Sequence, residues 1–407
     1  MSTPVVVAGA SMAGLRAAEQ LRAAGWTGPI TLVGDEPHMP YNRPPLSKEA
    51  LAGEAAFDSL AFRPRAAVSD VRWRLGTAVV RADLDQRVVE LDGGETLSYG
   101  GLVVATGMRA RRLRCPGPLT GRHTVRTLDD ARGLRAALTR PGARVVVVGA
   151  GFIGCEVAAT AVALSAAEVT VVDPLPLPMV GPLGELLARA LLRRHERRGV
   201  RFALGTGVTA FHGHDRVTGV ALADGRVLAA DAVVESVGSV ANTEWLRGNG
   251  LDLSDGVLTD EHLRVGGRPD VVAVGDVARF PNPRYDGVPR RVEHWSMPTD
   301  TARHAAKALT AHLTAHLTGG DGGGLAPFAP LPTFWSDQHD FRLQSFGAPA
   351  LGMDDVRVLD GDPNGDVLVG YHRAGRLVGV VALGGRAVAT AAVRYRAELL
   401  KQPSLTP

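Results

Sequence analysis

The chain has 407 residues, of which 45% are hydrophobic and 21% charged, the balance of a globular protein with two or three domains. Its formal net charge of +3 is too small and too dispersed to indicate nucleic-acid binding. No apolar stretch approaches the roughly 18 residues of a membrane helix, and no basic secretory leader precedes the first strand-like run, so we expect a cytoplasmic protein.

The first clear pattern is a strand, a glycine turn and a helix near the start of the sequence. Three valines at 5–7 lead into Gly9-x-Ser11-x-x-Gly14, and an Ala-rich helical stretch follows. Glycines here let the backbone turn tightly and let a pyrophosphate approach the free N–H groups of the helix. The next strand-like run ends at Asp35, whose carboxylate is well placed to accept hydrogen bonds from a ribose. The alternative is an ordinary strand-turn-helix corner.

The same pattern recurs in the middle of the chain. A valine run at 145–148 leads into Gly149-x-Gly151-x-x-Gly154, the complete dinucleotide-binding fingerprint, and the following strand-like run ends at Asp173. An acid at that strand end repels a 2′-phosphate and accepts the 2′-hydroxyl, and no arginine follows closely, so we expect NADH rather than NADPH. The alternative is that Asp173 serves only as a helix or turn cap.

Two such units imply two nucleotides, a resident flavin and a diffusible nicotinamide. The rest of the sequence contains three more strand-like runs, at 101–107, 231–238 and 271–276. A helical segment at 298–317 and a Gly/Pro-rich linker at 319–332 follow, and the final alternating segment, 333–407, ends in a helix. We therefore expect an α/β protein with two Rossmann-like dinucleotide-binding domains, for FAD and NAD, and a C-terminal α+β domain.

Several short motifs resemble those of the NADH:ferredoxin reductases that serve bacterial haem monooxygenases and aromatic dioxygenases. These motifs occupy residues 40–48, 105–107, 126–129, 275–276, 293–295 and 334–338. The resemblance implies a glutathione-reductase-type fold with these domains: an FAD-binding domain in two parts (1–112 and 241–318), an NAD-binding domain (113–240) and a C-terminal interface domain (325–407). Glu235, Ser236 and Ala241 depart from the family pattern near the expected nicotinamide site.

Cysteine usage separates this chain from the disulfide reductases of the same fold. Those enzymes have a C-x4-C pair where residues 43–48 stand here, and this chain has no cysteine before Cys115. Cys115 and Cys155 lie far apart, outside any C-x-x-C pair or His cluster, so we expect two packing residues and no metal site. Electrons on a flavin would have to leave directly, to a protein, a quinone or oxygen.

The resemblance also implies site residues. Lys48 and Glu156 would form an ion pair beside the flavin N5, and Trp335 would flank the flavin on the partner-facing side, which makes these three the predicted catalytic residues. The predicted cofactor-binding residues are Gly9, Ser11, Ala13, Gly14, Asp35, Arg43, Lys48, Val79, Arg126, Gly149, Gly151, Ile153, Gly154, Asp173, Asp276, Glu293 and Trp295.

Structural alternatives stay open for three of these residues. Lys48 could be a surface residue, Trp335 only the hydrophobic anchor of the third domain, and Trp295 a buried residue that caps an interdomain helix. The basic run 193–198 is interpreted as the solvated face of an amphipathic helix, without a function.

The sequence thus predicts an enzyme that oxidises NADH, reduces FAD, and passes electrons to an acidic [2Fe–2S] ferredoxin of an oxygenase system. One alternative is an NADH oxidase, or a reductase of a quinone or a small radical, on the same fold. Another is a redox-gated binding flavoprotein.

Overall fold

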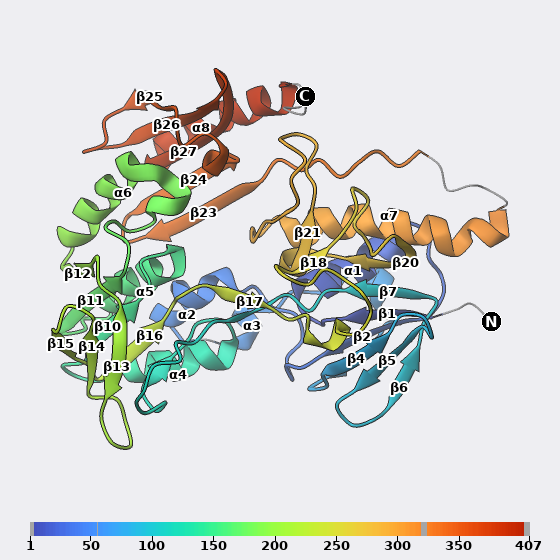
Figure 1. Cartoon of the computed structure of the whole chain (residues 1–407), viewed down its shortest axis with the longest axis horizontal. Coiled ribbons are helices and arrows are strands. Elements are labelled where there is room, and N and C mark those ends of the chain that lie inside the picture. The colour runs from blue at the N-terminus through green and yellow to red at the C-terminus, as the bar shows by residue number, and fades with distance from the viewer. Residues whose placement is uncertain (1–3, 55, 319–323, 403–407) are drawn as a thin grey trace.

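The apolar runs of the sequence form the central strands of three large sheets, and helices cover them (Figure 1). The computed structural model describes residues 4–54, 56–318 and 324–402. The α-helices of these ranges are α1 (Met12–Ala23), α2 (Glu49–Ala52), α3 (Phe57–Leu60), α4 (Leu128–Leu138), α5 (Phe152–Ala163), α6 (Val180–Glu196), α7 (Met297–Thr318) and α8 (Arg386–Lys401).

The first sheet has the strand order β19-β20-β7-β1-β2-β3. Its strands are β1 (Val5–Ala8), β2 (Ile30–Gly34), β3 (Arg72–Leu75), β7 (Gly101–Val104), β19 (Arg264–Val265) and β20 (Arg268–Ala273). Strand β1 is parallel to β2 and β7, and all its residues are buried, as expected for a central strand under the packed helices α1 and α7. Two small sheets complete this unit: β4 (Val79–Asp83), β5 (Val88–Leu91) and β6 (Thr96–Ser98); β18 (Val257–Leu258), β21 (Ala278–Phe280) and β22 (Arg290–Arg291).

The second large sheet is wholly parallel, in the order β12-β11-β10-β16-β9. Its strands are β9 (Arg122–His123), β10 (Arg144–Val148), β11 (Glu168–Asp173), β12 (Val200–Leu204) and β16 (Ala232–Glu235). A small antiparallel sheet accompanies it: β13 (Val208–His212), β14 (Gly219–Leu222) and β15 (Val227–Ala229). The two βαβ units expected from the sequence, β1-α1-β2 and β10-α5-β11, are therefore confirmed.

The two passages of the chain between these units lie side by side. They form β8 (Met108–Ala110) and β17 (Ser239–Ala241), which pair in antiparallel orientation. The expected boundary after residue 112 lies just beyond β8, and the expected boundary after residue 240 lies within β17. Both boundaries stay predictions.

The C-terminal unit is an antiparallel sheet in the order β23-β24-β27-β26-β25, packed against α8. Its strands are β23 (Thr333–Gln338), β24 (Phe341–Gly347), β25 (Val356–Gly361), β26 (Val367–Arg373) and β27 (Arg376–Gly384). Leucines of α6, such as Leu183 and Leu187, pack into the core of this sheet, so the unit lies directly on the second one (Figure 1). The expected fold class is confirmed, although residues 319–323 of the expected linker lie outside the described residues.

Two helices, α7 and α6, correspond to segments that the sequence predicts to be helical. The helix expected over 298–317 is α7, and no helix within the described ranges is long and apolar enough to cross a membrane. The interpretation of 193–198 as a solvated face is wrong for His195, which is fully buried. His195 continues the four-residue spacing of Leu187 and Leu191 along the buried face of α6, a signal that the sequence contained.

Candidate active site

The turn between β1 and α1 has room only for glycine at two of its positions. Gly9 has φ +116°, and a Cβ there would lie 2.1 Å from the carbonyl oxygen of Ala105. A Cβ on Gly14 would lie 1.9 Å from the carbonyl oxygen of Gly9. The two glycines therefore let strand β7 and helix α1 approach the turn closely, as a phosphate-binding turn requires.

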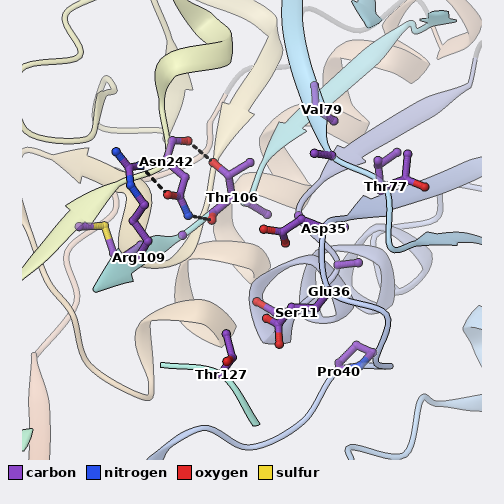
Figure 2. Close-up of a pocket in the computed structure, with 18 of the residues that line it drawn as sticks. Ser11, Asp35, Glu36, Pro40, Thr77, Val79, Thr106, Arg109, Thr127 and Asn242 are labelled. Carbon is purple, nitrogen blue, oxygen red and sulfur yellow. Dashed lines mark hydrogen bonds between the residues drawn. The ribbon is translucent and has the colours of Figure 1, made fainter. Parts of the chain in front are cut away.

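A cavity of about 430 Å³ opens beside this turn (Figure 2). It contains six of the predicted cofactor-binding residues: Gly9, Ser11, Asp35, Arg43, Val79 and Arg126. One wall is formed by the segment that leads into β8 and by Asn242, which directly follows β17. There the Thr106 hydroxyl donates to the Asn242 carbonyl at 2.6 Å, and the Asn242 amide donates to the Thr106 carbonyl at 2.9 Å (Figure 2). The cavity thus lies where the first unit meets the two passages of the chain that lead to and from the second unit.

Two neighbouring acids line the cavity, and only one is already engaged. Glu36 accepts hydrogen bonds from the Tyr41 hydroxyl at 2.5 Å and from the Arg43 guanidinium. The carboxylate of Asp35 accepts no hydrogen bond from the described residues, and the residue is exposed. Asp35 is therefore available for ribose hydroxyls, while burial raises the pKa of Tyr41 and keeps it a hydrogen-bond donor.

Arg126 links the cavity to Asp276. Its Nη2 lies 3.5 Å from Asp276 Oδ2, and its Nε donates to the carbonyl of Met108 at 2.9 Å. Burial lowers the pKa of Arg126 and raises the pKa of Asp276, so both charges are poorly hydrated. A Cβ on Gly275 would lie 2.8 Å from Cβ of Ala13, which shows how closely the segment before Asp276 approaches α1.

The second glycine turn repeats the first. Gly149 has φ +106° and a Cβ there would lie 2.1 Å from the Ser236 carbonyl oxygen, while a Cβ on Gly154 would lie 1.9 Å from the Gly149 carbonyl oxygen. No atom lies within 4 Å of a Cβ placed on Gly151, so this side of the turn is open to a ligand. Ile153, on the first turn of α5, is exposed.

Asp173 stabilises this second turn directly. Its carboxylate accepts hydrogen bonds from the backbone N–H groups of Ala150, at 2.7 Å, and Leu175, at 2.8 Å. The capping role that the sequence left open is therefore present. Each carboxylate oxygen has a second lone pair, so ribose binding by Asp173 is compatible with this role and stays a prediction.

Lys48 and Glu156 meet between the two glycine turns. Lys48 follows the 3₁₀ helix η1 (Pro44–Ser47), and its Nζ lies 2.8 Å from Glu156 Oε2 on α5. The side chains are 13% and 3% exposed, so Lys48 is not a surface residue. Ser47 and Ser336 also donate to Glu156, at 2.6 and 2.5 Å. Apart from the two motifs that contain these serines, no sequence pattern indicated the contacts.

Trp295 and Trp335 lie close together at the contact between α7 and the C-terminal unit. Their ring centroids are 5.7 Å apart at 67°, and Trp295 Nε1 donates to the Asn42 side chain at 2.9 Å. Trp295 is 40% exposed, so the alternative of a buried tryptophan is wrong. The carboxylate of Glu293 accepts hydrogen bonds from Arg291 at 2.7 Å and Ser239 at 3.0 Å. Lys48, Asp276, Glu293 and Trp295 do not line the cavity of Figure 2.

These features fit two dinucleotides. Each glycine turn offers the N-terminus of a helix, each is followed by an acid at the end of the next strand, and the first turn opens on a cavity with three arginines in its wall, Arg43, Arg109 and Arg126. The sequence contains two cysteines, and they pack into different hydrophobic clusters, where burial raises the pKa of the Cys155 thiol. They cannot form a redox-active pair.

Comparison with known proteins agrees with this architecture. Residues 3–306 match the family model described as pyridine nucleotide-disulphide oxidoreductase, and residues 333–402 match a model described as reductase C-terminal. The chain therefore belongs to the pyridine nucleotide-disulphide oxidoreductase family, and it has the additional C-terminal domain of reductases.

Particular relatives cover nearly the whole chain. Rhodocoxin reductase of Rhodococcus erythropolis is 38% identical over 92% of this chain and 85% of its own length. The ferredoxin--NAD(+) reductase component of the anthranilate 1,2-dioxygenase system of Burkholderia cepacia is 36% identical over 93% of this chain and 90% of its own. The crystal structure of the covalent putidaredoxin reductase–putidaredoxin complex matches with a TM-score of 0.87 and 31% identity, covering 98% of this chain and 93% of that one.

Proposed function

We propose that the chain is an FAD-dependent NADH:ferredoxin oxidoreductase that supplies a [2Fe–2S] ferredoxin of a monooxygenase or dioxygenase system. The observation that carries the proposal is the Lys48–Glu156 contact. Lys48 follows the loop that lines the first cavity, and Glu156 lies in the first turns of the helix that begins at the second glycine turn, so the pair stands where two bound nucleotides would meet. The relatives named above are ferredoxin reductases.

FAD, when bound, accepts two electrons from NADH and passes them on one at a time. The residues of the first turn, with Asp35, Arg43, Val79, Arg126 and Asp276, would hold FAD, and those of the second turn, with Ile153 and Asp173, would hold NADH. Lys48, fixed by Glu156, presents a compact ammonium group at the junction of the two sites. Since no thiol pair is present, electrons leave without a dithiol relay.

The exit side would be the surface near Trp295 and Trp335, where aromatic rings connect the first and third units. The net charge of +3 suits an acidic ferredoxin. A cytoplasmic location is part of this proposal.

A stopped-flow experiment tests the proposal. The purified yellow protein is reduced anaerobically with NADH and mixed either with a [2Fe–2S] ferredoxin or with air. Fast reoxidation by ferredoxin and slow reoxidation by oxygen are expected. Fast reoxidation by oxygen would indicate an oxidase, and fast reoxidation by quinones alone a quinone reductase. Slow reoxidation by every carrier, with a tight charge-transfer complex, would indicate a redox-gated binding protein, and absence of bound flavin would refute all of these.

A further inference from the structure

The carboxylate of Glu156 is surrounded by donors from two other parts of the chain. Oε2 accepts from the hydroxyl of Ser47, the last residue of η1, at 2.6 Å, and from Nζ of Lys48, the residue after it, at 2.8 Å. Oε1 accepts from the Ser336 hydroxyl of β23 at 2.5 Å. The first unit, the second unit and the C-terminal unit therefore meet at one buried carboxylate.

Further buried polar groups lie behind Ser336. Gln338 Nε2 is 2.9 Å from the Ser336 hydroxyl, Gln338 Oε1 is 2.8 Å from His195 Nε2 on α6, and His195 Nδ1 is 3.2 Å from His339 Nε2. Ser336 and Gln338 are buried, and His195 is enclosed by the rings of Phe202 and Phe341. A continuous hydrogen-bonded chain thus runs from Glu156 through β23 to α6.

Elementary chemistry fixes the direction of every bond in this chain. An ionised carboxylate can only accept, so Ser336 must donate its hydrogen to Glu156 and accept from Gln338. Gln338 therefore turns its NH₂ toward Ser336 and its oxygen toward His195, and His195 must donate Nε2–H. A buried neutral imidazole then has Nδ1 free to accept from His339.

We propose that Ser336, Gln338 and His195 are positioning residues that hold Glu156 in its ion pair with Lys48, an inference that rests on the proposed function for its catalytic meaning. This series of hydrogen bonds orients the side chains that form it, and it does not conduct protons, because the Gln338 amide lies in its middle. The hydrogen-bonded chain also lies beside the tryptophan pair: β23 turns Ser336 toward Glu156, and the adjacent residue Trp335 contacts Trp295.

The test uses the fact that the chain has three lysines, Lys48, Lys307 and Lys401. Labelling the cofactor-loaded protein with ¹⁵N-lysine gives three side-chain ammonium signals, and the water-exchange rate of the Lys48 signal reports its hydrogen bonds. We expect Ser336→Ala and His195→Met to raise that rate at least tenfold. Ser336→Thr, which keeps the hydroxyl, and His195→Gln, which keeps a donor for Gln338, should stay within twofold of wild type.

Asp337→Asn is the matched control, because Asp337 belongs to the same strand and pairs only with Arg342 in the described part of the chain. Its exchange rate should equal that of wild type. Equal rates in His195→Met and His195→Gln would overturn the proposal, since that result means that His195 acts by packing alone. An unchanged rate in Ser336→Ala would overturn it as well.

A kinetic measurement adds a second readout. The rate of flavin reduction by NADH should fall at least tenfold in Ser336→Ala and His195→Met, while the KM for ferredoxin stays unchanged. An unchanged rate of flavin reduction would refute the inference that these residues matter for catalysis. Absence of ferredoxin reduction by the wild type would refute the proposed function alone, because the ammonium exchange rates do not depend on ferredoxin.

Discussion

Arg122 and Glu235 form a fully enclosed, two-pronged ion pair at the edge of the second sheet. Nε and Nη2 of Arg122 each lie 3.0 Å from a different oxygen of Glu235, and the side chains are 1% and 0% exposed. The backbone N–H of Leu113 donates to the same carboxylate at 2.7 Å, and the guanidinium lies 3.9 Å from the ring centre of Phe211. Glu235, which departs from the family pattern, is therefore committed to holding Leu113 and the edge strand β9 against the end of β16.

Removing one member of this pair should destabilise the protein strongly. Glu235→Gln leaves the Arg122 charge buried without compensation, at a cost of roughly 3–5 kcal/mol in the free energy of unfolding. The double variant Arg122→Met/Glu235→Leu should be more stable than Glu235→Gln, because it buries no charge. Urea denaturation followed by circular dichroism measures both. A double variant less stable than the single one would contradict the explanation.

The two glycines of the second turn should respond differently to alanine. Gly154→Ala forces a Cβ to within 1.9 Å of the Gly149 carbonyl, so both the melting temperature and NADH binding should fall. Gly151 has φ −79°, and a methyl group added there would lie in open space, so the melting temperature of Gly151→Ala should stay unchanged. The methyl group would occupy the space of the ligand, so the Kd for NADH should rise at least tenfold, or about 1.4 kcal/mol. Flavin content, read from the visible spectrum, should stay unchanged in Gly151→Ala. Unaltered NADH binding in that variant would place the pyrophosphate elsewhere.

Asp35 and Asp173 occupy equivalent positions and offer a reciprocal test. Asp173→Asn removes the charge that repels a 2′-phosphate, so the ratio of kcat/KM for NADPH to that for NADH should rise about tenfold. Asp35→Asn should leave this ratio unchanged and instead raise the dissociation constant of FAD, measured on the deflavinated protein. An unchanged ratio in Asp173→Asn would mean that Asp173 acts only as the turn cap seen in its bonds to Ala150 and Leu175.

Local patterns were enough to predict the two βαβ units, helix α7 and the antiparallel C-terminal sheet, because period and glycine spacing are written in neighbouring residues. Contacts between distant segments carried no such signal. The bond between Ser336 and Glu156 spans 180 positions, and the pairing of Arg122 with Glu235 spans 113. Sequence spacing shows which residues share a face of one element, and packing decides which faces meet.

His195 should make the stability of the protein sensitive to acid. Burial, with a contribution from Arg198, lowers the pKa of His195 to about 4, against an ordinary value of about 6.5. Between pH 6.5 and 4 the unfolded protein protonates His195 and the folded protein does not. The stability that the neutral imidazole contributes is therefore fully present above about pH 6.5, and it is lost as the pH falls toward 4. Between pH 7 and 5 this loss should amount to about 2 kcal/mol.

His195→Gln removes the titrating ring and keeps a donor for Gln338. Between pH 7 and pH 5 the free energy of unfolding of this variant should therefore fall by about 2 kcal/mol less than that of the wild type. Urea denaturation of both proteins at pH 7 and pH 5 measures the difference. His214→Gln is the control, because His214 is exposed and, among the described residues, its ring bonds to Asp215 alone. This variant should show the wild-type pH dependence. If His195→Gln and wild type lost the same stability, the buried imidazole would have to be protonated in the folded protein, and His195 would then donate from both nitrogens rather than accept from His339.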